Sequence, residues 1–274
     1  MEIFGFDSFS PKEVAGRVND FCVVKARLPL LPMCMLGLLA GAFIGLGALY
    51  YVVIVSDASL GFAAARVAGG VCFSLGLLLV VVAGAELFTG NNLLAMGWAS
   101  GCVTLREVLR NWIVVGTANF AGAAGLALLV YLSGHWEMNG GAVGATYLKI
   151  AAAKAALPGW RAFFLGVLCN VLVCMAVWMA LAGRSVMDRF IAIVFPVSAF
   201  VAAGFEHSIA NMYFFPLALL LKWHGLALPP GGDAITVAGM LGNLAPVIAG
   251  NIAGGSVLVA LVYWVIYRRD ASRP

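Results

Sequence analysis

The chain has 274 residues, of which 63% are hydrophobic and only 10% are charged, and its net charge is +4. A soluble domain carries roughly 25% charged residues, so this composition excludes an ordinary soluble enzyme and predicts a single membrane domain. The small positive charge is explained by membrane topology, and we expect no nucleic-acid partner.

The first segment, residues 1–27, predicts an amphipathic helix. It lacks a basic stretch followed by an apolar core and a cleavage site, so we expect no signal peptide. Ser10, Pro11 and Glu13 have the spacing of a capping box with proline at the first helical position. The next apolar residues share one helical face, which indicates a helix on the cytoplasmic surface of the membrane; they are Val14, Val18, Phe21 and Cys22.

Residues 28–267 predict a six-span channel domain. Long stretches without charge can each hold the ~20 residues that cross a hydrocarbon core ~30 Å thick. The spans are predicted near residues 28–55, 62–101, 108–132, 160–182, 190–221 and 242–267. The second and fifth are too long for one crossing, and each carries an acid midway, Glu86 and Glu206, so we expect both to be interrupted. Residues 268–274 then form a cytoplasmic tail.

The third and sixth spans look like copies of each other. Asn111, Asn119, Gly122 and Tyr131 recur 132 residues later as Asn243, Asn251, Gly254 and Tyr263. Each half then holds three spans, an odd number, so the halves must be inverted relative to each other. This predicts an all-α integral membrane fold of two inverted three-helix repeats, with a transport site at the bilayer midplane between them.

An even number of spans places both termini on one side of the membrane. Eleven of the 16 Lys and Arg residues fall on that side. The other five are Arg66, Lys149, Lys154, Arg161 and Lys222. Because cytoplasmic segments carry the excess of basic residues, we expect a multi-pass protein of the bacterial cytoplasmic membrane with both termini in the cytoplasm.

The two acids each follow a glycine, in Gly84-Ala85-Glu86 and Gly204-Phe205-Glu206. A carboxylate in mid-membrane costs at least ~2.5–3.5 kcal/mol, so it needs partners. A helix that breaks at glycine frees backbone N–H groups, and we expect the carboxylates to accept them as staples of the break. A proton relay is the alternative. The positive ends of the half-helices would favour an anion between them.

His207 is the one histidine deep in an apolar segment, and it adjoins a buried acid at a predicted break. It is the side chain there that could change charge near neutral pH, so we expect it in a pore rather than as a packed core residue. Thr89 could contact a small oxyanion or cap the following half-helix. Phe73, Leu77 and Phe200 fit either a pore or a core. No cysteine or histidine pattern points to a metal, a haem or another cofactor.

These segments resemble the formate/nitrite transporter family over nearly the whole chain. The most specific are Gly84-Ala85-Glu86-Leu87-Phe88-Thr89 and the run Gly204–Met212 (GFEHSIANM). The resemblance implies an aquaporin-type fold, assembled in the lipid bilayer as a homopentamer with one pore per subunit. It also implies a break in the second span at residues 87–89 and one in the fifth just before His207.

The resemblance further implies residue roles along the pore. Two hydrophobic constrictions would flank His207, formed on the cytoplasmic side by Leu77, Leu87 and Phe88 and on the periplasmic side by Phe73 and Phe200. The polar neighbours of the centre would be Asn170 and Asn211. Lys154 corresponds to a lysine of the periplasmic vestibule, and with Arg161 it would draw the anion in.

We therefore expect a channel for small monovalent weak-acid anions, with formate first and with proton-linked passage at His207. The segment at Glu86 and Gly183-Arg184-Ser185-Val186-Met187-Asp188 are more similar to formate channels, whereas Gly90 is closer to the nitrite branch. A nitrite or hydrosulfide channel, a proton-coupled anion carrier and a neutral-solute channel remain as alternatives.

Overall fold

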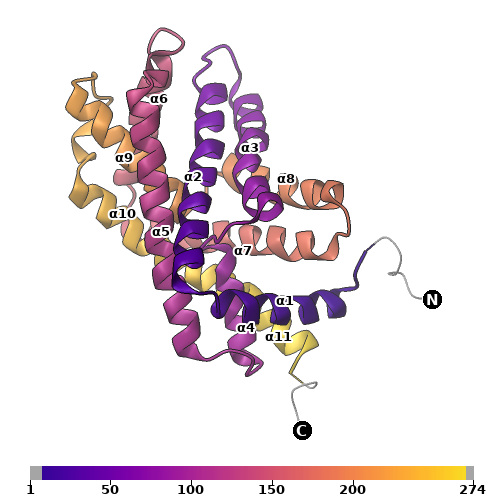
Figure 1. The fold of residues 1–274 in the computed structure, drawn as a ribbon. Coiled ribbons are helices and arrows are strands. Elements are labelled where there is room, and N and C mark those ends of the chain that lie inside the picture. The colour runs from indigo at the N-terminus through magenta and orange to yellow at the C-terminus, as the bar shows by residue number, and fades with distance from the viewer. Residues whose placement is uncertain (1–7, 270–274) are drawn as a thin grey trace.

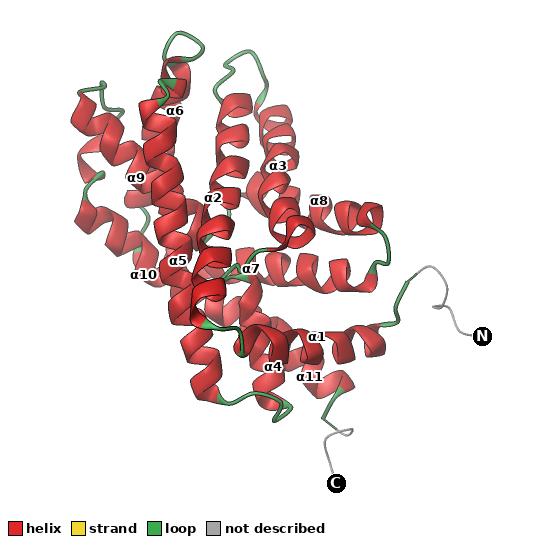
Figure 2. Cartoon of the chain, viewed as in Figure 1, coloured by secondary structure: helices red, strands yellow, loops and turns green. Residues whose placement is uncertain are grey.

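A computed structural model of the chain describes residues 8–269, and these residues form a bundle of helices without β-strands (Figure 2). The predicted tail 268–274 lies outside the described residues except for residues 268 and 269, and residues 1–7 of the N-terminal segment are outside them as well. Within residues 8–269, six helical segments are long and apolar enough to cross a membrane: Leu30–Val55, Phe62–Gly84, Leu105–Leu132, Gly159–Ala182, Val186–Ala203 and Val237–Tyr267. The prediction of six spans is confirmed.

The two halves of the chain contain their principal helices in the same order, a short first helix, a span, an interrupted span and a further span (Figure 1). The first half comprises α1 (Pro11–Ala26), α2 (Leu30–Val55), α3 (Phe62–Leu78), η1 (Leu79–Gly84), η2 (Gly90–Leu93), α4 (Leu94–Ala99) and α5 (Leu105–Leu132). After the turn η3 (His135–Glu137), the second half comprises α6 (Ala142–Ala155), α7 (Gly159–Ala182), α8 (Val186–Ala203), α9 (Ser208–His224), η4 (Gly232–Ala234), α10 (Val237–Ile252), η5 (Ala253–Leu261) and α11 (Val262–Tyr267).

Both predicted interruptions are present. The second span leaves the helical conformation after η1 and resumes at η2, and the fifth stops at the end of α8 and resumes at α9. The glycine at each break has a positive φ, +86° at Gly84 and +76° at Gly204. Glycine adopts this conformation without the steric cost that a Cβ would add, so these two residues end the first half of each broken span.

Three spans begin several residues earlier than predicted, because local caps extend them. The third begins at Leu105 with a capping box between Thr104 and Glu107. The fifth begins at Val186 behind the Ser185 cap, and the sixth at Val237 behind a threonine whose side chain accepts a backbone N–H. These polar residues satisfy the first free N–H groups of each helix.

The helix α6 is a difference from the sequence prediction, in which residues 133–159 contained no helix. Its alanine-rich sequence favours a helix, but it is too short and too charged to be recognised as a span. α6 packs against α9 and carries Lys154 in its last turn. In the order of elements it stands before α7 as α1 stands before α2.

The helix crossings repeat between the halves. A Cβ at Gly122 in α5 would overlap the backbone of Leu38 in α2, and a Cβ at Gly254 in η5 would overlap the backbone of Val167 in α7. Glycine therefore permits the same close approach of two backbones in each half. Together with three spans per half, this confirms the predicted pair of inverted repeats.

The helix α1 has the predicted capping box: the Ser10 Oγ accepts the Glu13 N–H at 3.3 Å, and the Glu13 carboxylate accepts the Ser10 N–H at 2.7 Å. Its apolar face, including Val14, Val18 and Cys22, is buried in a cluster with α4 and α7. Figure 1 shows α1 lying across one end of the bundle beside α4 and α11. The two ends of the described chain therefore lie on the same side.

Candidate transport pathway

Three cavities lie in series between the two halves. The outer vestibule, about 270 Å³, lies on the side of α6, and the inner vestibule, about 540 Å³, lies on the side of α1. Between them is a central chamber of about 10 Å³. The chamber shares the side chains of Phe73, Phe200 and His207 with the outer vestibule and those of Leu77 and Leu87 with the inner one. These five residues thus surround one path from one vestibule to the other.

The central chamber is a narrow, apolar constriction. Besides the five residues shared with the vestibules, it is lined by Ile44, Val173 and Val197. A cavity needs roughly 10–15 Å³ to hold one water molecule, so this chamber has no room for a hydrated ion. Its only polar wall group is the imidazole of His207. A solute that passes must shed its water between these apolar side chains.

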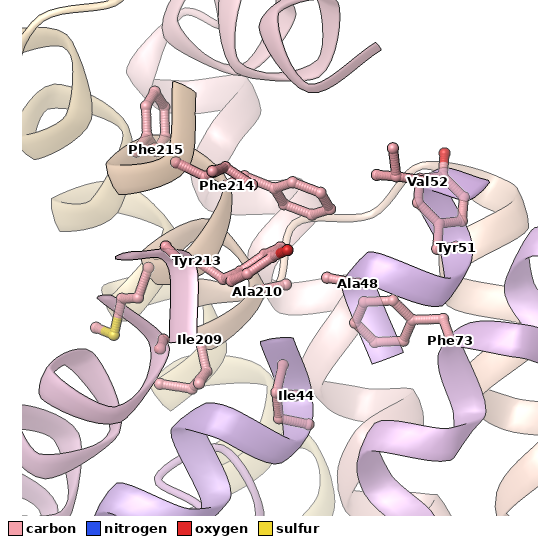
Figure 3. Packing of buried hydrophobic residues seen from close by; sticks show 14 of the residues in the cluster. Ile44, Ala48, Tyr51, Val52, Phe73, Ile209, Ala210, Tyr213, Phe214 and Phe215 are labelled. Atoms are coloured by element: carbon pink, nitrogen blue, oxygen red, sulfur yellow. The ribbon is translucent and has the colours of Figure 1, made fainter. Parts of the chain in front are cut away.

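Aromatic rings form the outer wall of the constriction. The Phe73 and Phe200 rings meet edge to face with centroids 5.8 Å apart, and the imidazole of His207 stacks on Phe200 at 5.8 Å and 15°. In Figure 3, the Phe73 ring projects toward Ala48 of α2 and Ala210 in the first turn of α9. The edge-to-face contact fixes the rings at the entrance of the chamber.

Thr89 and His207 meet at the centre of the protein. The Thr89 Oγ1 lies 3.1 Å from the His207 Nε2, and both side chains are buried. Thr89 comes from the break of the second span and His207 from the break of the fifth. The contact therefore joins the two halves at the point where each helix is interrupted.

The backbone of α9 fixes the tautomer of His207. Its Nδ1 accepts the N–H of Ala210 at 3.1 Å, so the imidazole acts as the N-cap of α9. A neutral imidazole has one acceptor and one donor nitrogen, so Nε2 carries the hydrogen and donates it to the Thr89 oxygen. The Thr89 hydroxyl keeps its own hydrogen, although Thr89 is fully buried and is not among the residues that line the three cavities.

Each buried acid is held by a lysine and an asparagine. The Glu206 carboxylate accepts Lys154 Nζ at 2.7 Å and Asn211 Nδ2 at 2.6 Å. In the first half, the Glu86 carboxylate accepts Lys25 Nζ at 2.5 Å and an asparagine Nδ2 at 2.7 Å. Neither carboxylate accepts a backbone N–H freed by the break, so that part of the sequence prediction is wrong. The lysine comes from a helix outside the span, a contact that no local pattern reveals.

The freed backbone groups are bound by two other asparagines instead. Asn119 accepts the Phe88 N–H at 2.9 Å and donates to the carbonyls of Gly37 and Glu86. Asn251 does the same in the second half: it accepts the Ser208 N–H at 3.0 Å and donates to two carbonyls at 2.8 and 3.0 Å. Asn119 and Asn251 are one of the residue pairs that identified the repeat, and they staple the breaks.

The remaining predicted site residues lie near the pathway but do not line the three cavities. The Phe88 ring packs edge to face on Trp112, because consecutive residues at the break point in different directions. Asn170 donates to the Thr89 carbonyl at 3.2 Å and so positions the central threonine, whereas Asn211 belongs to the group around Glu206. Their roles at the pore stay predictions.

The two basic residues predicted for the vestibule are placed differently. Lys154 lines the outer vestibule. Arg161 is exposed at the start of α7, its guanidinium carbon is 5.1 Å from the Trp160 ring centroid, and it is not among the residues that line the cavity. Arg66 lines this vestibule instead. In the sequence prediction Arg66 counts only toward the charge difference across the membrane, and its position five residues into an otherwise apolar span is the signal that could have revealed it.

Two inverted halves that enclose two vestibules, joined through a narrow apolar chamber with His207 in its wall, define a membrane channel or transporter for small solutes. A family model described as formate/nitrite transporter matches residues 12–265. The chain belongs to the formate/nitrite transporter family, as its sequence motifs indicate, and it is a transport protein rather than an enzyme.

Known proteins of this family resemble the chain along nearly its whole length. The formate channel FocA of Escherichia coli strain K12 is 39% identical over 275 residues, covering 97% of this chain and 96% of that protein. A solved structure titled FNT family ion channel has a TM-score of 0.82 at 31% identity and covers 93% of this chain and 98% of its own. A pentameric formate channel with formate bound has a TM-score of 0.79 at 35% identity, with 87% and 97% covered.

Proposed function

We propose that the chain conducts formate, and related small monovalent weak-acid anions, across the bacterial cytoplasmic membrane by proton-linked passage. The observation that carries the proposal is the buried Thr89–His207 contact, in which His207 lines the apolar chamber that separates two vestibules. The E. coli relative named a formate channel and the related structure with formate bound support formate as the first substrate.

An anion that crosses the central chamber must lose its hydration, which costs free energy. Moving a carboxylate-sized ion from water to a low dielectric costs ~20 kcal/mol in the ideal Born limit and several kcal/mol after relaxation. Protonation removes this cost, because formic acid is neutral. The apolar walls of the central chamber disfavour the charged form, so the proton affinity of formate rises as it leaves the outer vestibule for the chamber.

The passage then has three steps. Formate enters the outer vestibule and takes a proton from water at the entrance of the central chamber. Neutral formic acid crosses between Phe73, Phe200, Leu77 and Leu87, and on the way it accepts a hydrogen bond from the Thr89 hydroxyl, which is polarised by the His207 Nε2–H. The acid reaches the inner vestibule and returns its proton to water, so one proton crosses with each formate.

The competing version keeps the substrate charged and neutralises it with a protonated His207. The Ala210 amide points its hydrogen at Nδ1, so a second ring proton would break the cap of α9 and place two hydrogens against each other. The resting geometry therefore favours a neutral imidazole, and with it the passage of the neutral acid.

The membrane arrangement follows from the same features. We place α1 at the cytoplasmic surface with both termini in the cytoplasm, since both described ends lie together and that side has the excess of basic residues. Residues 28–267 form the channel domain. Five copies assemble in the bilayer with one pore each, a proposal supported by the related pentameric channel.

The experiment is a substrate panel on purified protein in proteoliposomes. Formate, nitrite, hydrosulfide and lactate are each offered at two external pH values. We expect formate to enter fastest, with a faster rate at the lower pH, because a larger fraction is protonated. Water or glycerol flux without any formate flux would contradict the proposal and favour a neutral-solute channel.

Two substitutions of His207 separate its roles. His207→Asn keeps an acceptor for the cap of α9 but replaces the imidazole that faces Thr89. His207→Phe removes both functions. We expect His207→Asn to fold and to show an altered pH dependence of formate flux. If both variants transport formate like the parent at every pH, the central role of His207 is wrong.

A further inference from the structure

The outer vestibule has two cationic side chains on its wall, Lys154 and Arg66, and they differ in their partners. The Lys154 Nζ is 2.7 Å from a Glu206 carboxylate oxygen, so the field of this pair largely cancels at a distance. The Arg66 guanidinium has no carboxylate within ion-pair distance among residues 8–269. Arg66 is therefore the uncompensated positive charge on this wall.

Neutral groups hold the guanidinium of Arg66 in place. Its Nε donates to the carbonyl of Ala202 at 2.9 Å, and its Nη1 donates to the Tyr51 hydroxyl at 3.3 Å. A guanidinium has five N–H groups in a planar fork, so these bonds leave N–H groups for a further acceptor. The side chain is half-buried, so a charge placed there is screened less than one in open water.

The position of Arg66 connects it to the entrance of the central chamber. Ala202 is in the last turn of α8, directly before the break, and the outer Nη2 of Arg66 packs against Gly204 at the break itself. His207 follows three residues later. An anion held by Arg66 therefore lies in the same cavity as the Phe200–His207 wall through which it must pass.

We propose that Arg66 is the residue that attracts and holds the monovalent anion in the outer vestibule before it is protonated. Arg161 does not line this cavity, and the charge of Lys154 is balanced by Glu206. This inference rests on the proposed transport of formate and adds to it the residue that sets the apparent affinity on the outer side.

The first test is the concentration dependence of formate uptake by oriented proteoliposomes. Arg66→Gln should raise the half-saturating formate concentration about tenfold, which corresponds to ~1.4 kcal/mol. The rate at saturating formate should change little, because the central chamber is intact. In the parent, added impermeant salt should weaken uptake at low formate, since the Debye length is ~10 Å at 0.1 M; Arg66→Gln should lack this dependence.

Two further variants separate charge from structure, because Arg66 also ties α3 to α2 and α8. Arg66→Lys keeps the charge but cannot bridge both acceptors, and its half-saturating concentration and salt dependence should stay near those of the parent. Arg161→Gln removes a guanidinium from the exposed start of α7, and it should change the half-saturating formate concentration by no more than about twofold. A structural role alone would impair Arg66→Lys as much as Arg66→Gln.

A variant at Val201 tests the charge with Arg66 still present. Val201 lines the same vestibule and adjoins Ala202, so Val201→Glu supplies a carboxylate that can balance Arg66. Val201→Glu should raise the half-saturating concentration well above that of Val201→Gln, its uncharged match. This comparison tests whether the charge of Arg66 attracts formate even if Arg66→Gln does not assemble.

The outcomes distinguish this inference from the function on which it rests. A parent protein that carries no formate contradicts the proposed function, and the assignment of Arg66 falls with it. If the parent carries formate, and Arg66→Gln has the same half-saturating formate concentration and the same salt dependence as the parent, the Arg66 assignment alone is overturned. Equal half-saturating formate concentrations for Val201→Glu and Val201→Gln would overturn the Arg66 assignment as well.

Discussion

Replacing Lys154 with methionine should destabilise the folded protein, because the substitution leaves the buried carboxylate of Glu206 without its cation. The two side chains are 15% and 5% exposed, and the charged atoms are 2.7 Å apart. At an effective dielectric constant of ~20, charges at this distance attract by about 6 kcal/mol, which offsets the desolvation of both groups. Losing one partner of a buried pair costs ~3–5 kcal/mol. Asn211 still binds the carboxylate, so we expect a loss near the lower end, ~3 kcal/mol.

A double variant shows whether the unbalanced charge is the cause. Lys154→Met combined with Glu206→Gln removes both charges and leaves an amide oxygen for Asn211. Since a buried pair can often be replaced as a whole at little cost, the double variant should be more stable than Lys154→Met alone. The assay is thermal and denaturant unfolding of the purified protein, with native gels to follow its assembly.

The first half of the chain supplies the matched control. Lys25 and Glu86 form the equivalent pair, with side chains 13% and 6% exposed. Lys25→Met should therefore lose about as much stability as Lys154→Met. If Lys154→Met is as stable as the parent, or if the double variant is less stable than Lys154→Met, the reasoning about the buried pair is refuted.

Three other substitutions test separate features of the fold and the pathway. Gly250→Ala should prevent the packing of α10 against α7 and so prevent folding, because its Cβ would overlap a backbone carbonyl of α7. Gly242→Ala in the same helix meets nothing within 4 Å and should be tolerated; expression and gel filtration measure both variants. Leu87→Ala should widen the inner side of the chamber and raise water permeability, measured by osmotic shrinkage of liposomes; unchanged shrinkage would exclude Leu87 from the constriction. Hydrogen bonds from Ser10 lower the pKa of the Glu13 carboxyl below its ordinary value of 4.5. The capping box is therefore present at neutral pH and is lost as the pH falls through that lowered pKa. The protection of the first amides of α1 against hydrogen exchange, relative to the intrinsic rate at each pH, should fall in acid, and Glu13→Gln should remove that pH dependence; identical protection profiles would contradict the cap.

The sequence predicted those parts of the fold that depend on local patterns. The breaks follow from a glycine and an acid in mid-span, and the repeat follows from asparagines and glycines at a constant offset. The capping box of α1 is a four-residue pattern. The breaks and the capping box depend on residues that are close together in sequence. The repeat is visible when the sequences of the two halves are compared.

The parts that could not be predicted depend on packing between distant segments. The partners of Glu206 include Lys154 from α6, a helix whose short alanine-rich sequence resembles a loop region between spans. The direction of Phe88 depends on the backbone at the break and on Trp112. The position of Arg66 in the vestibule depends on the packing of α3 against α8, where the Arg66 guanidinium donates a hydrogen bond to the Ala202 carbonyl.

The site was predictable in its residue types but not in its hydrogen bonds. The position of His207 beside a break indicated a pore residue, and its motif supported the same role. The cap that fixes its tautomer requires the Ala210 N–H, and the contact with Thr89 joins segments 118 positions apart. Whether the imidazole is neutral or charged at rest is therefore a question that only the folded geometry addresses.

The most direct test of proton-linked passage is to record formate uptake, internal pH and electrical current together in the same proteoliposomes. We expect one proton to enter with each formate, so that the interior acidifies in proportion to uptake and no current accompanies it. In His207→Asn the ratio of protons to formate or its pH dependence should change. A formate current that follows the membrane voltage, with no internal acidification, would contradict the account.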